Sequence, residues 1–139
     1  MKGVTDERKS HGKSGAVYEM ICNTCEKTYI GENARSAYIR GKEHHAHARN
    51  GHPELSAVAE HTWTSHDIEW TPSVIASCKN NRERKVKEAW LIHDRERKGK
   101  MTMNRDRGVE LSKLWVDLVC ELGVKFGVKL WLNCYFSFC

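Results

Sequence analysis

The alternation of apolar and polar positions near the start of the chain predicts a β-hairpin. One apolar run extends from Ala16 to Ile21 and a second from Lys27 to Ile30, with the turn-like segment Cys22-Asn-Thr-Cys25 between them. Two short runs of β-forming residues around such a turn are typical of paired antiparallel strands. The segment from Gly31 to Ala34 is expected to end the second strand.

Helical patterns follow the predicted hairpin. Ser36 is suited to cap a helix that runs to about His47, and the segment Asn50-Gly-His-Pro53 should end it. A second helix is expected to begin between Pro53 and Ser56. Its predicted apolar side comprises Leu55, Val58, Ala59 and Trp63.

A third strand and a long helix complete the predicted domain. Residues Val74 to Ala76 form the strand, and Asn80 or Asn81 begins a helix that ends near Arg97. The positions of this helix with core-like spacing are Val86, Ala89, Trp90 and His93. The order β-β-α-α-β-α predicts a mixed α/β (α+β) domain with a small sheet flanked by helices.

Composition and charge fit one globular domain with a polyanionic partner. The chain has 139 residues, of which 40% are hydrophobic and 29% charged, and its net charge is +5. Eleven basic and five acidic residues lie between Lys79 and Arg107, so this segment alone carries +6. A solvated helix face would show the same pattern, so the charge supports nucleic-acid binding only together with other signals.

The two ends of the chain differ from the predicted domain. Residues 1–14 form a polar leader without the apolar core of a signal peptide, which predicts an intracellular rather than a secreted protein. Residues 116–139 form an apolar tail of unknown role. Charged residues interrupt this tail, which argues against a membrane span.

The cysteines and histidines suggest a metal site. Cys22, Cys25, His61 and His66 give the pattern C-x2-C-x35-H-x4-H, which fits a structural zinc site that clips the hairpin to the second helix. His45 and His47 are alternative ligands from the same region, and buried cysteines beside surface histidines would need no metal at all. A redox role is disfavoured because the cysteine pair does not begin a helix.

Four motifs in order carry a family resemblance. They are Gly15-Ala-Val-Tyr18, the Cys22–Cys25 pair, Tyr29-Ile-Gly-Glu-Asn-Ala-Arg-Ser36 and Asn104-Arg-Asp-Arg-Gly108. Taken together they resemble the GIY-YIG nucleases, and most closely the zinc-containing endonuclease domains of Penelope-like retrotransposons. The resemblance covers residues 15–115 and implies the GIY-YIG fold.

The resemblance also implies a reaction and its residues. It predicts metal-dependent hydrolysis of a DNA phosphodiester, in which Glu88 holds a catalytic Mg²⁺ or Mn²⁺ and Arg40 stabilises negative charge on the phosphate. Tyr18 is expected to be the general base, and Tyr29 a second positioning hydroxyl. The full predicted catalytic set is Tyr18, Tyr29, Arg40, His44, Glu88 and Asn104.

DNA is the predicted partner, with no membrane partner and no small-molecule cofactor. The residues expected to contact DNA are Arg35, Arg95, Arg97, Lys98 and Arg105. The implied task is nicking DNA for retroelement insertion, in the nucleus and together with a reverse transcriptase.

Two positions depart from the family pattern. Ala34 stands where glycine is usual, and Gly41 lies inside the first predicted helix, at a cost of about 1 kcal/mol relative to alanine. These departures support a second hypothesis, a catalytically inactive, zinc-stabilised DNA-binding remnant of a mobile element.

Overall fold

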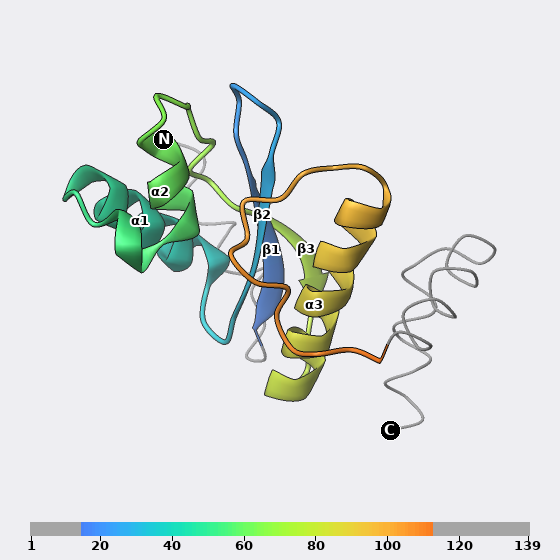
Figure 1. Cartoon of the computed structure of the whole chain (residues 1–139). Helices are drawn as coiled ribbons and strands as arrows, with labels where there is room; N and C mark the ends of the chain where they lie inside the picture. The colour runs from blue at the N-terminus through green and yellow to red at the C-terminus, as the bar shows by residue number, and fades with distance from the viewer. Residues whose placement is uncertain (1–14, 113–139) are drawn as a thin grey trace.

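The computed structural model describes residues 15–112, which form a small sheet with helices on both faces (Figure 1). The elements are β1 (Ala16–Ile21), β2 (Thr28–Asn33), α1 (Ala37–Arg49), η1 (Pro53–Leu55), α2 (Ala57–Thr62), β3 (Ser73–Ser77) and α3 (Asn81–Arg97). The predicted mixed α/β architecture and the order β-β-α-α-β-α are confirmed, with one 3-10 turn, η1, between the first two α-helices.

The sheet is antiparallel, with β1 between β2 and β3. Its register places Tyr18 opposite Gly31 and Met20 opposite Tyr29. β2 continues to Asn33, so the expected break from Gly31 to Ala34 is wrong. The reason is local: a Cβ on residue 31 would lie 2.6 Å from the Tyr18 hydroxyl, so the ring of Tyr18 fills the space beside the glycine within a continuous ladder.

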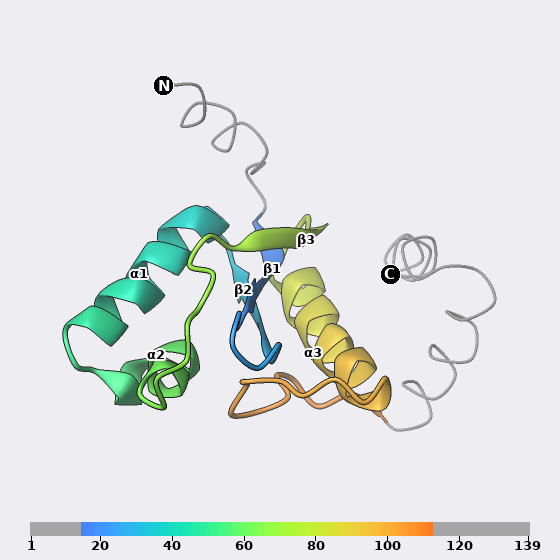
Figure 2. The ribbon, with the colours of Figure 1, turned by 90° about the horizontal axis from the view of Figure 1, so that it is seen from above.

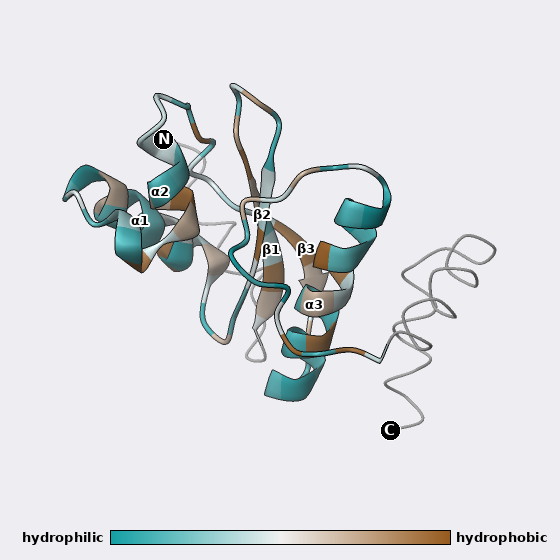
Figure 3. Ribbon diagram, in the orientation of Figure 1, coloured by the Kyte–Doolittle hydropathy of each residue, from teal (hydrophilic) through white to brown (hydrophobic). Residues whose placement is uncertain are grey.

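The alternation of side chains divides the core between the two faces of the sheet. Figure 2 shows α1 and α2 on one face and α3 on the other. Tyr18 and Met20 pack toward α1 and α2, whereas Val17 and Ile30 pack with Ile92 of α3. Because both faces are covered, five of the six β1 residues are buried or half-buried. The apolar strands between largely hydrophilic helices are visible in Figure 3.

Two of the four residues expected on the apolar side of α2 are wrongly placed. Val58 and Ala59 are buried, but Leu55 is 56% and Trp63 64% exposed. The helix proper spans Ala57–Thr62 only, so both exposed residues flank it and cannot turn toward the core.

Gly41 is required by the way α1 packs. A Cβ at this buried position would lie 2.7 Å from both the Trp70 carbonyl oxygen and the Pro72 ring. The segment that leads into β3 therefore approaches the backbone of α1 closely, and a larger residue would force the two apart.

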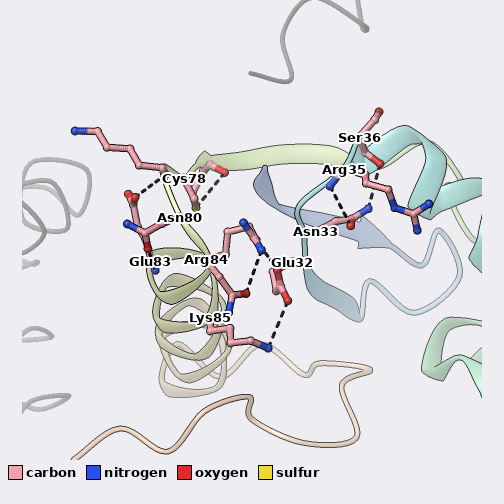
Figure 4. Close-up of polar contacts among 12 residues, drawn as sticks. Glu32, Asn33, Arg35, Ser36, Cys78, Asn80, Glu83, Arg84 and Lys85 are labelled. Atoms are coloured by element: carbon pink, nitrogen blue, oxygen red, sulfur yellow. Dashed lines mark hydrogen bonds and ion pairs between the residues drawn. The ribbon is translucent and has the colours of Figure 1, made fainter. Parts of the chain in front are cut away.

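Polar contacts fix α3 to the sheet (Figure 4). Asn80 caps the helix by accepting a hydrogen bond from the Glu83 backbone N–H. Arg84 Nε lies 2.7 Å from Glu32 Oε2 on β2, and Lys85 reaches the other oxygen at 3.7 Å. Of the predicted core positions of α3, Ala89 and Trp90 are buried, while Val86 and His93 are half-buried.

No helix within residues 15–112 has the length and apolar character needed to cross a bilayer. The predicted leader, residues 1–14, and the predicted tail, residues 116–139, lie outside the described residues.

Candidate functional site

Two cysteines and two histidines converge at the outer end of the hairpin. Cys22 and Cys25 lie in the turn between β1 and β2, His61 lies on α2, and His66 follows that helix. The ligand atoms of these residues all lie within 4.8 Å of one another. Cys25 Sγ is 3.2 Å from His61 Nε2, and Cys22 Sγ is 3.5 Å from His66 Nδ1.

These distances fit a tetrahedral ion. Zinc bonds of about 2.3 Å to sulfur and about 2.0 Å to nitrogen place neighbouring ligand atoms roughly 3.3–3.8 Å apart. The two histidine nitrogens, 2.9 Å apart, would need to separate only slightly. Burial opposes ionisation of Cys22, but hydrogen bonds from Cys25 and Thr24 outweigh it and lower the pKa of this thiol. The cluster can therefore bind a metal such as zinc.

His45, one of the alternative ligands, is engaged elsewhere. Its ring stacks on Trp70, with the ring centroids 4.6 Å apart and an interplanar angle of 21°. Neither His45 nor His47 belongs to the metal-binding cluster among the described residues.

A separate pocket gathers most of the predicted catalytic residues. Its volume is about 180 Å³, and it lies between α1, the start of α2, α3 and the segment after α3. The lining residues include Tyr29, Arg40, His44, Ser56, Glu88, Asn104, Arg105 and Asp106. Five predicted residues from widely separated parts of the chain therefore meet here: Tyr29, Arg40, His44, Glu88 and Asn104.

Tyr18 lies behind this pocket rather than in its wall. It is fully buried, and its hydroxyl is 3.0 Å from His44 Nε2. Burial, followed by the neighbouring Tyr29, raises the pKa of Tyr18 far above its usual range. Burial and the charge of Glu88 also raise the pKa of Tyr29. Both phenols therefore remain neutral near pH 7.

His44 connects Tyr18 to the start of α2. Its Nδ1 lies 2.7 Å from Ser56 Oγ, so the imidazole is held from both sides. Burial, and then the charge of Arg40, lower the pKa of His44 to about 4, which keeps the ring neutral at pH 7.

Glu88 lies one helical turn beyond Arg84, the residue that anchors α3 to β2. Burial, and then the negative charges of Glu32 and Asp106, raise the pKa of Glu88 to about 7, against an opposing effect of Lys85. The carboxylate is thus held in negative potential, where a divalent cation would relieve the repulsion.

Asn104 and Arg40 have defined partners. Asn104 accepts a hydrogen bond from the Ile30 backbone N–H at 3.0 Å and donates to the Ile30 carbonyl at 2.7 Å. It therefore pairs with β2 much as a strand residue would, beside Tyr29. Arg40 Nη1 lies 2.6 Å from Glu43 Oε2, so its charge is shared between Glu43 and the pocket.

The residues expected to contact DNA are all paired with acidic groups. Their ion pairs are Arg35–Glu43, Arg95–Glu19, Arg97–Asp94, Lys98–Asp94 and Arg105–Glu60. Of these five residues, only Arg105 lines the pocket that contains Tyr29, Arg40 and Glu88. Arg95 instead lines a larger cavity of about 560 Å³ with Glu19 and Lys100.

Ser56 and Asp106 line the pocket but were not among the predicted site residues. Asp106 stands in the quoted motif Asn104-Arg-Asp-Arg-Gly108 and could have been singled out there. In the sequence, Ser56 is marked only as a residue near the start of the second helix. Its contact with His44 could not be predicted, because it depends on how α1 and α2 pack.

No protein-family model, curated protein sequence or solved structure matches the chain.

Proposed function

We propose that this chain is a metal-dependent DNA endonuclease of the GIY-YIG type. The observation that carries the proposal is the pocket that joins Tyr29, Arg40, Glu88 and Asn104. These residues come from a strand, two helices and the segment after α3, and they supply a hydroxyl, a cation, a carboxylate and an amide. This combination suits phosphodiester hydrolysis, because negative charge builds on the phosphate while water attacks it and a nearby cation or metal ion can stabilise that charge.

In this proposal Glu88 holds a divalent ion, with Asp106 on the same pocket wall. Carboxylates are the ligands that Mg²⁺ and Mn²⁺ prefer. When bound, the ion supplies a Lewis acid for the phosphate and an activated water. Arg40 and Arg105 bind the phosphate oxygens, and the Tyr29 hydroxyl orients the reacting groups. Tyr18 lies behind the pocket wall and acts on the site through its hydrogen bond with His44, which lines the pocket.

The zinc cluster has a structural role in the proposed enzyme. Four protein ligands leave no position open for substrate, so the ion would stabilise rather than catalyse. The same hairpin carries Tyr18 and Tyr29, so the cluster also fixes the strands behind the pocket.

We further propose that the substrate is DNA that the protein nicks for insertion of a Penelope-like retroelement, in the nucleus and with a reverse transcriptase. The motif order supports this assignment. Burial of Tyr18 and the pairing of Arg40 with Glu43 favour the second candidate, an inactive zinc-stabilised DNA-binding remnant.

A plasmid-nicking assay separates the two candidates. Supercoiled plasmid is incubated with protein in Mg²⁺, in Mn²⁺ or in EDTA, and DNA binding is measured in parallel by gel shift. The endonuclease should nick only with metal, Glu88→Gln should lose nicking while retaining binding, and Glu110→Gln, at an exposed position, should match the wild type. Binding without metal-dependent nicking by the wild-type protein would leave only the remnant.

A further inference from the structure

Ser56 connects two elements through one hydroxyl group. The residue is the N-cap of α2, is 3% exposed, and accepts a hydrogen bond from the Ala59 backbone N–H at 3.2 Å. The same oxygen lies 2.7 Å from His44 Nδ1 on α1. The serine that caps α2 is therefore also the hydrogen-bond partner of Nδ1 of the buried His44 imidazole.

The hydrogen-bonding capacity of the hydroxyl decides the direction of this contact. A serine hydroxyl has one hydrogen to donate and two lone pairs to accept with. Ala59 uses a lone pair, and the other contact of the hydroxyl within residues 15–112 is with His44 Nδ1, which can accept its hydrogen only when Nδ1 carries no proton. If Nδ1 carried a proton, the buried Ser56 hydrogen would have no acceptor among these contacts, which is costly.

We propose that Ser56 is a positioning residue that holds His44 in the tautomer with its proton on Nε2. His44 then donates a hydrogen bond to the Tyr18 oxygen, 3.0 Å away, and does not accept the phenol proton. The Tyr18 hydrogen is left for Tyr29, whose ring centroid lies 6.3 Å from that of Tyr18 and whose side chain interacts with it.

In this tautomer His44 is a hydrogen-bond donor to Tyr18 and not a base that accepts the Tyr18 proton. An Nε2–H donor and the nearby charge of Arg40 both act on the Tyr18 oxygen, so negative charge that develops there is stabilised. The catalytic consequence rests on the proposed function, whereas the tautomer is a property of the folded protein alone.

Nitrogen-15 NMR of the full-length, zinc-supplemented protein at pH 7 tests the proposal directly. Protonated and unprotonated imidazole nitrogens have well-separated shifts, and a His44→Gln sample identifies the His44 signals among the eight histidines. The expected wild-type result is a protonated Nε2 and an unprotonated Nδ1. A protonated Nδ1 in the wild-type protein would overturn the proposal, even if no variant folds.

Three variants test whether Ser56 sets the tautomer. Ser56→Thr keeps the hydroxyl and the cap and should keep Nε2 protonated. Ser56→Asp keeps a capping oxygen but only accepts, so the proton should shift to Nδ1. Ser56→Ala should lose the preference and show shifts averaged between the tautomers. An unchanged tautomer in both the Asp and Ala variants would show that Ser56 does not control it.

Nicking is measured on the same samples. The threonine variant should lose much less rate than the aspartate variant, which should lose rate without losing DNA binding. An inactive wild-type protein with the expected tautomer would end the endonuclease proposal and leave the assignment of His44 intact. An active protein with Nδ1 protonated would do the reverse.

Discussion

Replacing Glu88 with glutamine removes a negative charge that burial and neighbouring acidic residues destabilise. Burial, and then Glu32 and Asp106, raise the pKa of this carboxyl from 4.5 to about 7. At about 1.4 kcal/mol per pH unit, the full difference would correspond to roughly 3 kcal/mol. Because the side chain is partly exposed, solvent screening reduces the expected effect to roughly 1–2 kcal/mol.

The sign follows from proton linkage. A carboxyl whose pKa is higher in the folded than in the unfolded state destabilises the fold when it is ionised. This cost is small below pH 4.5, grows as the pH rises toward 7, and is complete above it. Glutamine carries no charge at any pH, so Glu88→Gln should be more stable than wild type by roughly 1–2 kcal/mol at pH 8 and by much less at pH 5.

Urea denaturation at pH 5 and pH 8, with zinc held constant and Mg²⁺ absent, measures this difference. The exposed Glu110→Gln variant is the matched control and should follow the wild type at both pH values. Adding Mg²⁺ at pH 8 should stabilise the wild-type protein and the Glu110→Gln control, which both retain the Glu88 carboxylate, but not Glu88→Gln. A Glu88→Gln variant no more stable than wild type at pH 8, or equally stabilised at both pH values, would refute the electrostatic account of the pocket.

Two further predictions concern the hairpin. Gly31→Ala should destabilise the protein by roughly 1–3 kcal/mol in the same urea assay, because the added Cβ would lie 2.6 Å from the Tyr18 hydroxyl; an unchanged midpoint would contradict this packing. Protein purified without added metal should contain one zinc ion per chain by elemental analysis, and Cys25→Ser should lower that content; a folded, zinc-free wild-type protein would rule out the structural zinc site.

Short-range patterns predicted the elements well. β1 was predicted with its observed limits, and β3 and α3 were placed to within one residue at each end. β1 lies in the middle of the sheet and α3 begins after a clear end signal, Asn80, so for these two elements local pattern and tertiary structure agree. Gly31 misled the prediction because glycine usually weakens a strand, whereas here the neighbouring Tyr18 ring requires it.

Charged residues on α3 show a second limit of sequence patterns. Glu83, Arg84 and Lys87 are all buried, although their sequence resembles a solvated face. Lys87 Nζ lies 2.7 Å from Glu83 Oε1 within the helix, and Arg84 reaches Glu32 across the sheet. Much of the basic segment is therefore engaged within the protein, which no count of charges could have revealed.

The part of the candidate site that could be predicted is the one in which residue type and spacing together indicate a particular chemistry. Cys22, Cys25, His61 and His66 were identified from spacing and converge as expected. Burial of Tyr18 was not foreseen, because it depends on the packing of α1 and α2 against β1. The same packing creates the contact between Ser56 and His44.

The two sites are mechanically linked through the hairpin register. Adjacent residues of a strand point to opposite faces, so a slip of one residue would turn Tyr18 from the α1 and α2 face toward α3. The glycine opposite Tyr18 resists such a slip, because only Gly31 leaves room for the ring. Cys22 and Cys25 join the outer end of the hairpin to α2, whose other end holds Ser56 against His44. Tyr18 lies four residues before Cys22, or about 13 Å along the strand at ~3.3 Å per residue. A metal bound by the cysteines and histidines would therefore fix Tyr18 in two ways, through strand β1 and through its hydrogen-bond partner His44.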